Sequence, residues 1–423
     1  MSIPSSASPT TASAASANAA GGSYRAPLVI VTLLFFMWGL LTSLNDVLIP
    51  HLKALYTLSY VEAMLVQFCF FGAYFLVSLP AGRLIKRLGY QRGAVTGLVI
   101  AAVGCLLFLP AVTAGYAVFL LGFFVLAAGI TILQVAANPY VAALGDPGTA
   151  SSRLTMTQAF NSLGTAIAPS LGVFILSVAV NATPAEQAAS VRGPYIALAA
   201  ALLLLALFFG FAKLPHVVGE DEAHDKPATP AWAVARANPH LLWGVVGIFL
   251  YVGAEVCIGS LLINFMADPQ IGGMTAAQAF PYLSIYWGGA MVGRFIGVFT
   301  MRVFRPGRVL ATHAALSVLL VLIAVMSHGP VAMWALLLVG LCNSIMFPTI
   351  FSMGVHRLGA DTGQGSGLLC MAIVGGAVLP VVQGWMADGL GLQHSFLLPA
   401  ICYVGIAAYG WVYSGLFQSA KAD

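Results

Sequence analysis

Two acidic residues lie inside long apolar stretches of the chain, Asp46 near the N-terminus and Glu255 in the second half. A carboxylate inside a membrane-spanning helix costs about 2.5–3.5 kcal/mol on insertion scales, so each one needs a partner or a function. A carboxyl group at that depth can take up and release a small cation such as H⁺ or Na⁺. The two residues therefore predict ion-dependent chemistry within a membrane.

The residues around Asp46 form a polar face on the predicted first helix. Trp38, Thr42 and Asn45 follow at i, i+4 and i+7, which places them on one face, and Asp46 lies on the same broad side. We predict a cation site of Asp46, Asn45 and Thr42 that faces a central cavity, beside groups that bind a sugar. In the alternative interpretation, Asp46 caps a break in the helix just before Pro50.

Glu255 has three interpretations that the sequence leaves open. It can be a second cation ligand, an acceptor for a hydroxyl group of the substrate, or the structural partner of Arg294, which also lies within an apolar stretch. For Arg294 itself we predict a tether or clamp within the membrane rather than an anchor for the substrate.

Neutral amides in the apolar stretches form a second polar group. Gln134 and Asn138 are spaced i, i+4, and Gln158 and Asn161 are spaced i, i+3. An amide both donates and accepts hydrogen bonds, which suits a ligand with many hydroxyl groups; the alternative is hydrogen bonding between helices. The predicted substrate-binding residues are Trp38, Asn45, Gln134, Asn138, Gln158, Asn161, Glu255, Asn264, Trp287, Asn343 and Gln383.

The composition indicates which elements position these residues. The chain has 423 residues, of which 60% are hydrophobic and 7% charged, whereas soluble globular proteins carry about 25% charged residues. Lipid must therefore be the main solvent, and a membrane-spanning helix needs roughly 20 apolar residues. Twelve stretches are long enough: 27–53, 60–82, 93–112, 115–142, 154–178, 193–213, 239–266, 276–301, 307–327, 329–353, 364–386 and 394–417.

The chain is built from two matched halves. Asp46 and Glu255 are 209 positions apart, and so are Pro139 and Pro348, which indicates a duplication and the plan of a secondary transporter. We predict an all-α membrane protein with a disordered cytoplasmic tail at 1–26, an N-terminal six-helix bundle at 27–213, a cytoplasmic linker at 214–238, a C-terminal six-helix bundle at 239–417 and a cytoplasmic tail at 418–423.

The basic residues indicate the orientation of the chain in the membrane. With the N-terminus inside, 14 of the 17 Lys and Arg fall on the cytoplasmic side, Lys53 and Arg192 fall outside, and Arg294 falls within a span. The positive-inside rule then predicts that both termini are cytoplasmic. The six cysteines all lie in apolar stretches without metal-ligand spacing, so we expect small core residues.

A short basic turn between the second and third stretches, 82–93, predicts a moving part. It combines glycines with Arg83, Lys86, Arg87 and Arg92, and a weaker copy begins at Gly293. In the alternative interpretation these charges only set topology. The predicted conformational latch consists of Gly82, Arg83, Arg87, Gly89, Arg92 and Arg294.

Several classes of function are disfavoured by missing motifs. The sequence contains no G-x-x-x-x-G-K-[ST] loop, so ATP-driven transport is not supported. It also lacks a nucleophile–base pair and paired histidine ligands, so we expect neither an enzyme nor a cofactor, and no metal site beyond Na⁺ at Asp46. The expected partners are the substrate and membrane lipid, without nucleic acid, and we expect a monomer.

Three runs resemble a known family. Leu-Asn-Asp-Val-Leu-Ile-Pro (44–50), Gln-Val-Ala-Ala-Asn-Pro-Tyr (134–140) and Gln-Ala-Phe-Asn-Ser-Leu-Gly (158–164) are similar to the fucose:proton symporter family of the major facilitator superfamily, and within it to bacterial glucose/galactose transporters. The resemblance covers nearly all of the chain from about residue 27. It implies the major facilitator fold, with twelve transmembrane helices in two pseudo-twofold six-helix bundles, alternating access and a bacterial inner membrane. It also implies that Asp46 matches the essential acid of the first helix and Asn161 a sugar-site amide of the fifth.

The chain departs from the fucose-type pattern at one position. Those members have a glutamate where this chain has Gln134, and an amide cannot take up a proton there. Either Asp46 alone carries a proton, or Glu255 substitutes, or the coupling ion differs; Na⁺ suits a carboxylate with Asn and Thr oxygens nearby. Gln134 also favours a sugar other than fucose.

These observations together predict import of a hexose, glucose or galactose, by symport with H⁺ or Na⁺ through alternating access. Two alternatives stay open. One is an antiporter of the same fold that exports drugs or metabolites, and the other is an uncoupled sugar facilitator or sensor.

Overall fold

The structure is a computed structural model that describes residues 24–55, 60–176, 192–215, 217 and 229–417, without the side chains of 44–55, 60–67, 112–113, 169–176 and 276–277. Within those residues the chain is helical and contains no strand. The helices of the first half are α2 (Arg25–Leu55), α3 (Tyr60–Leu88), α4 (Tyr90–Ala114), α5 (Tyr116–Ala143), α6 (Ala150–Leu176) and α8 (Arg192–Phe211), with the short 3₁₀ helix η1 (Pro147–Thr149) before α6.

The second half repeats this plan with two broken helices. Its elements are α11 (Pro239–Ala267), α12 (Ala276–Val303), α13 (Pro306–Met326), α14 (Gly329–Asn343), α15 (Met346–Gly354), η2 (Gly359–Asp361), α16 (Thr362–Met371), η3 (Ala372–Val374), α17 (Gly375–Leu390), α18 (Leu392–Ser395) and α19 (Leu397–Val412). The predicted span 329–353 is thus divided into α14 and α15, and the span 364–386 into α16, η3 and α17. A short helix, α10 (Ala231–Ala237), lies within the predicted linker.

Ten of the helical segments within the described residues are long and apolar enough to cross a membrane. The described part of α12, which corresponds to the predicted span 276–301, does not reach that apolar composition, and of α6, which corresponds to the predicted span 154–178, only residues 150–168 have described side chains. These two helices pack against each other across the junction between the halves, so much of their polar surface has protein rather than lipid as its neighbour.

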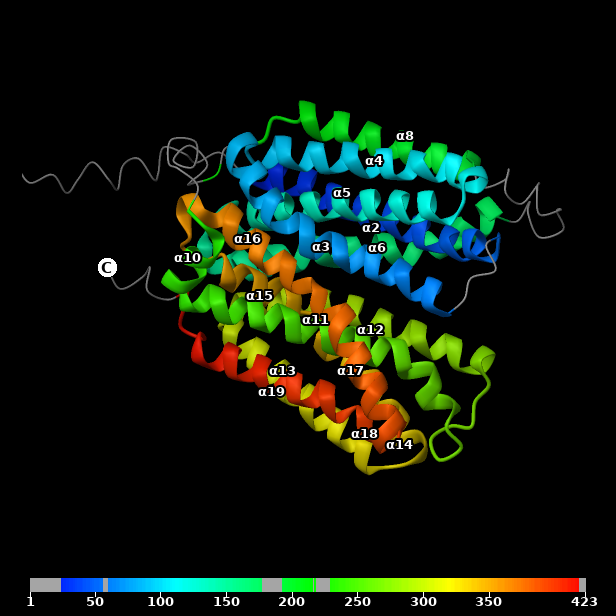
Figure 1. Cartoon of the computed structure of the whole chain (residues 1–423). Coiled ribbons are helices and arrows are strands. Elements are labelled where there is room, and N and C mark those ends of the chain that lie inside the picture. Colours follow the sequence, from blue (N-terminus) through cyan, green and yellow to red (C-terminus); the bar gives the residue numbers. More distant parts are fainter. Residues whose placement is uncertain (1–23, 56–59, 177–191, 216, 218–228, 418–423) are drawn as a thin grey trace, which may run out of the picture.

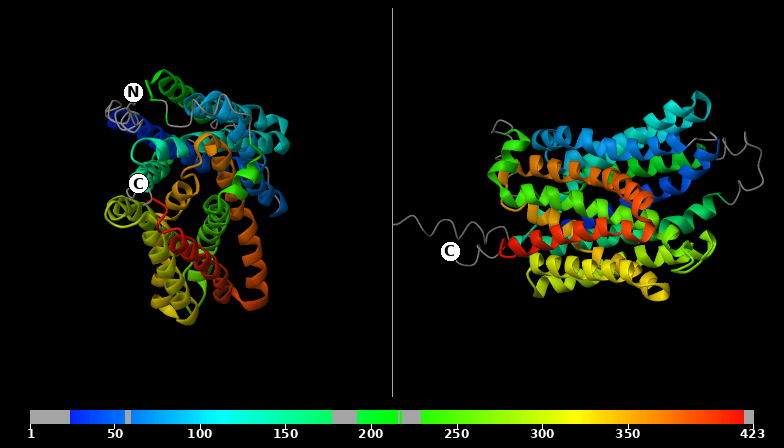
Figure 2. Two further views of the ribbon diagram at one scale, coloured as in Figure 1. Left: turned by 90° about the vertical axis from the view of Figure 1, so that its left-hand side faces the viewer. Right: turned by 60° about the horizontal axis from the view of Figure 1, so that its bottom comes forward.

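The two halves form two adjoining bundles. Figure 1 shows α2–α8 mainly in the upper part and α11–α19 mainly in the lower part, with α16 beside α3 where the halves meet, and Figure 2 shows the two halves from two other directions. Within the halves the main packing partners are α4 with α5, α2 with α6, α13 with α19 and α11 with α17. Between the halves they are α3 with α16 and α6 with α12.

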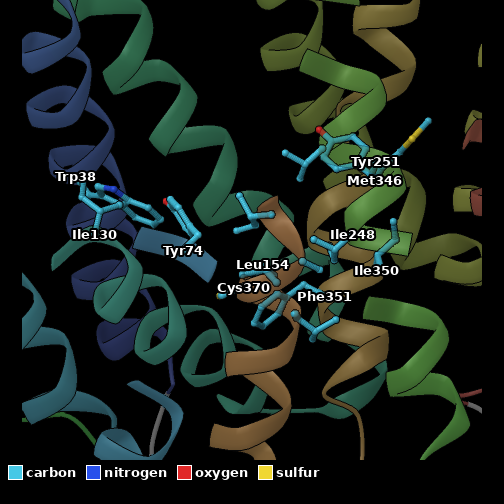
Figure 3. Packing of buried hydrophobic residues seen from close by; sticks show 14 of the residues in the cluster. Trp38, Tyr74, Ile130, Leu154, Ile248, Tyr251, Met346, Ile350, Phe351 and Cys370 are labelled. Atoms are coloured by element: carbon cyan, nitrogen blue, oxygen red, sulfur yellow. The ribbon is translucent and has the colours of Figure 1, made fainter. Parts of the chain in front are cut away.

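The buried apolar core is continuous from one half to the other. Figure 3 shows Trp38, Tyr74 and Ile130 of the first half at one side and Tyr251, Ile248 and Ile350 of the second half at the other, with Leu154, Cys370 and Phe351 between them. All six cysteines are free and five of them are buried, as expected for small core residues.

The contacts between the halves gather at one end of the bundle, which we call the contact end. It carries the turns that follow α3, α5, α12 and α15. Here the Ser151 and Ser352 hydroxyls are 2.7 Å apart, and Ser152 Oγ donates to the carbonyl oxygen of Val298 at 2.8 Å. Lys86 Nζ, near the end of α3, lies 3.6 Å from Asp361 Oδ1, just before α16. These polar contacts, from the ends of α3, α6, α12, α15 and η2, fasten the halves together on one side.

Candidate functional site

A cavity of about 190 Å³ lies between the two halves, and we call it the central cavity. The first half contributes side chains from α2, α5 and α6, and the second half contributes them from α11, α12, α15 and η3. Its lining residues are Trp38, Gln134, Gln158, Asn161, Tyr251, Val252, Glu255, Arg294, Phe347 and Ile373. Six of these ten residues were predicted site residues, from five spans.

A second cavity of about 150 Å³ lies within the first half. It shares Trp38, Gln134 and Asn161 with the central cavity, so these three side chains stand between the two spaces. Its other lining residues are Thr42, Phe70, Tyr74, Phe123, Leu126, Ala127 and Ile130. Four aromatic rings thus surround a wall of amide groups, an arrangement that can hold a ligand with both apolar faces and hydroxyl groups.

The amides of the first half are oriented by hydrogen bonds that use their nitrogens. Gln134 Nε2 donates to the Tyr74 hydroxyl at 2.6 Å, and Asn161 Nδ2 donates to the carbonyl oxygen of Phe35 at 2.9 Å. An amide whose nitrogen is engaged still has a carbonyl oxygen that accepts two hydrogen bonds. This wall of the cavity therefore offers hydrogen-bond acceptors to a ligand that donates hydrogen bonds.

Close packing of α2 on α6 brings Asn161 to this position. A Cβ added at Gly39 would lie 2.1 Å from the carbonyl oxygen of Asn161, and one at Gly164 would lie 2.3 Å from that of Phe36. Only glycine allows the two backbones to approach so closely. The Asn161 side chain can then reach the backbone of α2.

The second half places its charged groups on the opposite wall. Glu255 Oε1 accepts a hydrogen bond from the Tyr251 hydroxyl at 2.7 Å, one helical turn away on α11. Arg294 donates from Nε to the carbonyl oxygen of Ser344 at 3.2 Å and from Nη1 to Ser162 Oγ of the first half. Glu255 and Arg294 share the cavity but are not joined by an ion pair within 4.0 Å; among the described residues that distance is met by Lys86 and Asp361.

A glycine fixes the backbone next to Arg294. A Cβ at Gly293 would lie 2.5 Å from Ser344 Oγ and 2.6 Å from the carbonyl oxygen of Leu341. The helices α12 and α14 therefore touch at Gly293, and the following residue is brought to the carbonyl group that it binds.

Five predicted binding residues do not line either cavity. Asn264 is exposed and Trp287 is 45% exposed, whereas Asn138, Asn343 and Gln383 are buried in the helix packing. Asn343 donates to the Tyr286 hydroxyl at 2.9 Å and accepts from the Tyr403 hydroxyl at 2.7 Å, and Asn138 accepts from Gln158 at 3.4 Å. In this conformation Asn138 and Asn343 link side chains rather than line a cavity.

The predicted cation site is only partly described. Thr42 lines the cavity of the first half, and its hydroxyl donates to the carbonyl oxygen of Trp38 at 2.9 Å. Asn45 and Asp46 continue α2 beyond Thr42, but their side chains lie outside the described residues. Their role stays a prediction.

The predicted latch residues lie near the contact end, apart from Arg294. Arg83, Arg87 and Arg92 are exposed, whereas Gly82 is buried, and a Cβ there would lie 2.6 Å from the carbonyl oxygen of Gly363. Gly89 has φ 80° between α3 and α4, a conformation that favours glycine. Lys86, rather than its arginine neighbours, bonds to the other half.

Sequence reasoning identified Trp38 but missed the other aromatic residues of the site and Ser162. Tyr74, Phe70 and Phe123 surround the amides, while Tyr251 bonds Glu255. Aromatic residues make up 11% of the chain, so their presence alone carries little information. The i, i+4 spacing of Tyr251 and Glu255 was the available signal.

Comparison with known proteins agrees with this architecture. A family model described as Major Facilitator Superfamily matches residues 29–374. A glucose/galactose transporter of Brucella abortus is 54% identical over 392 residues, which cover 92% of this chain and 94% of the relative. The L-fucose-proton symporter of Escherichia coli K12 is 35% identical over 404 residues, which cover 91% and 92%. A solved structure of the Major Facilitator Superfamily transporter FucP in the outward conformation superposes with a TM-score of 0.86 at 35% identity, covering 92% of this chain and 99% of that chain.

Proposed function

Because the chain belongs to the Major Facilitator Superfamily, and is therefore a membrane transporter rather than an enzyme, we propose that it imports glucose or galactose across a bacterial inner membrane by symport with protons. The relatives are named as glucose/galactose transporters and as L-fucose-proton symporters. The chain is more similar to the Brucella protein, at 54% identity, than to the fucose symporter, at 35%.

The observation that carries this proposal is the wall of oriented amides in the central cavity. Gln134 and Asn161 have their nitrogens engaged by the protein and keep their oxygens for a ligand. A hexose supplies several hydroxyl donors and an apolar ring face, which the Trp38 ring can cover. The cavity of about 190 Å³ is also smaller than the roughly 300–1,000 Å³ typical of sites for drug-sized molecules, which disfavours a drug exporter.

Transport would proceed by rocking of the N-terminal bundle, 27–213, against the C-terminal bundle, 239–417. The sequence places the contact end on the cytoplasmic side, because the basic turns of the positive-inside pattern lie there. In this orientation both termini are cytoplasmic, and the halves are fastened together on the cytoplasmic side. The sugar would enter from the outside, and release would require the contact end to open.

The proposal is tested by reconstituting the purified protein in liposomes with labelled sugar. An inward proton gradient should drive accumulation of glucose and galactose, by at most about tenfold for each pH unit and each coupled proton. Accumulation driven by a sodium gradient alone would overturn proton coupling. Equilibration without accumulation would indicate a facilitator, and proton-driven movement in the opposite direction would indicate an antiporter.

The binding site is tested with a pair of asparagine variants. Asn161→Ala removes an amide of the central cavity and should weaken hexose binding by about 1–3 kcal/mol, or about 5–150-fold. The matched control is Asn264→Ala, because Asn264 is exposed and lies outside the cavity linings. Equal effects of the two variants on the binding constant would contradict the assignment of the site.

A further inference from the structure

We propose that Glu255 and Arg294 form a proton switch in which Glu255 carries a coupled proton and the cross-half bond from Arg294 to Ser162 controls its release. The inference rests on the proposed proton symport and assigns its coupling step to the second half. Asp46 remains the predicted acid of the first half, and Glu255 is the second acid that Gln134 cannot supply.

Glu255 has the position that a proton carrier needs. It lies near the middle of α11 (Pro239–Ala267) and lines the central cavity. Its described hydrogen bond is the one that it accepts from Tyr251, through one of its two oxygens. The ionisable groups that act on it electrostatically are Arg294, Tyr251, Tyr286 and Tyr403. A proton neutralises the carboxylate where water cannot solvate it fully.

Arg294 is the cation that can neutralise the Glu255 carboxylate in place of this proton, but its guanidinium group is bound to other residues. It belongs to the same half as Glu255 and lines the same cavity, yet its guanidinium bonds Ser344 O and Ser162 Oγ. Ser162 is ready to accept, because its own hydroxyl proton is directed to the carbonyl oxygen of Gln158 at 3.0 Å. The bond to Ser162 crosses from α12 to α6 and so depends on how the halves are placed.

Movement of the halves would therefore change the partner of Arg294. With the contact end closed, Arg294 is bound to Ser162, and Glu255 takes a proton from the cavity by forming an O–H bond. When the contact end opens, α6 moves away from α12 and the bond to Ser162 breaks. Arg294 then pairs with Glu255, the O–H bond breaks, and the proton leaves to cytoplasmic water. The carrier returns with the carboxylate and the guanidinium paired.

The switch also determines the charge that crosses the membrane. The loaded carrier holds neutral Glu255 and charged Arg294, whereas the returning carrier holds both charges, which cancel. The loaded form thus has one more positive charge than the returning form. Uptake should be electrogenic, and an inside-negative potential should accelerate it.

The first test is Glu255→Gln, which keeps a hydrogen-bond acceptor for Tyr251 and removes the proton site. Reconstituted protein should lose accumulation of glucose driven by a pH gradient, and exchange of labelled for unlabelled glucose, measured in the same liposomes, reports whether the variant is folded and still moves sugar. Accumulation equal to that of the wild type would overturn the inference. If the wild type itself shows glucose exchange without a response to the pH gradient, the proposed proton symport fails instead, so the two failures are distinguishable.

The second test removes the competing partner and leaves both charged residues in place. Ser162→Ala should free Arg294 to approach Glu255 before the contact end opens. An opposite charge nearby disfavours protonation of a carboxylate, so the external pH for half-maximal uptake should move down by about one unit. The matched control is Ser152→Ala, because Ser152 also bonds α12 from α6, at Val298 O, without contacting Arg294.

The comparison of Ser162→Ala with Ser152→Ala tests the proton switch even if Glu255→Gln does not fold. A downward shift for Ser162→Ala and an unchanged midpoint for Ser152→Ala support the switch. An unchanged midpoint in both variants, or an equal shift in both, would overturn it, because the effect would then be absent or would reflect only a looser junction.

Discussion

A methyl group added at Gly82 should open the contact end. Gly82 lies on α3 and faces α16, where a Cβ would lie 2.6 Å from the carbonyl oxygen of Gly363 and 3.4 Å from the Cα of Gln364. Both neighbours are backbone atoms, so they cannot rotate away as a side chain can. Gly82→Ala therefore forces α3 and α16 apart. The strain is relieved when the halves separate at this end, a movement that leaves the packing inside each half intact.

The size of the effect follows from the cost of overpacking. Extra methyl groups in a well-packed contact cost typically about 1–3 kcal/mol, which changes an equilibrium between two conformations by about 5–150-fold. The assay is the distance between spin labels at Arg92→Cys and Arg302→Cys, two exposed positions on α4 and α12 at the contact end. We expect Gly82→Ala to enrich the population with the longer distance by that factor.

Gly72 provides the matched control for this experiment. It lies on the same helix, and a Cβ added there would have nothing within 4 Å. Gly72→Ala should leave the distance distribution as in the wild type. The reasoning is refuted if Gly82→Ala also leaves it unchanged, or if both variants shift it equally.

Three further predictions concern the acid of the first half, the core and the contact end. Asp46→Asn should abolish uphill hexose uptake and retain exchange, measured in liposomes; uphill uptake at the wild-type level would contradict its role in coupling. Asn343→Leu should lower the melting temperature of the protein in detergent. The substitution leaves the Tyr286 and Tyr403 hydroxyl groups without their amide partner, and each unsatisfied buried hydroxyl costs about 1–3 kcal/mol of stability. An unchanged melting temperature would show that these two hydrogen bonds do not stabilise the fold. Burial lowers the pKa of His356, which lies outside the spanning segments, to about 4, below its value of about 6.5 in the unfolded chain. The stability that neutral His356 contributes is therefore complete above about pH 6.5 and is lost as the pH falls toward 4. His356→Gln should reduce the difference between the melting temperatures measured at pH 7 and at pH 5.

The fold could be predicted from the sequence because lipid imposes a simple rule on it. Spanning helices must be long and apolar, so their number and order follow from the distribution of polar residues. The breaks at Ser344–Ile345 and Ala372–Val374 could not be predicted in this way. They depend on how neighbouring helices pack; for example, a Cβ at Gly375 would lie 2.1 Å from the carbonyl oxygen of Phe249.

The site could be predicted only to the level of polar residues in spanning helices. Which of them reach the cavity depends on the rotation of each helix, and neighbouring residues point about 100° apart. Tyr286 is 1% exposed and bonds Asn343, whereas the next residue, Trp287, is 45% exposed. The apolar sequence on every side of these helices gives no amphipathic pattern from which to deduce that rotation.

The repeat relates the amides of the two halves and explains their different roles. Gln134 and Asn343 are 209 positions apart, the same interval as Asp46 and Glu255. Each amide donates from its nitrogen to a tyrosine hydroxyl, Gln134 to Tyr74 and Asn343 to Tyr286. The same kind of hydrogen bond therefore occurs in both halves, although Tyr74 and Tyr286 are 212 rather than 209 positions apart.

The difference between the two amides lies in the carbonyl oxygen. In the second half Tyr403 donates to Asn343 at 2.7 Å, and the amide is 1% exposed. In the first half the amide of Gln134 lines both cavities, so its oxygen can accept a bond from a substrate. Tyr403 on α19 thus occupies the carbonyl oxygen of Asn343, and the polar residues that the second half contributes to the central cavity are Tyr251, Glu255 and Arg294. Under the proposed function, the first half then supplies the hydroxyl acceptors for a sugar beside the predicted acid Asp46, and the second half supplies Glu255 as a further acid, because a substrate hydroxyl needs a free acceptor and a proton needs an acid.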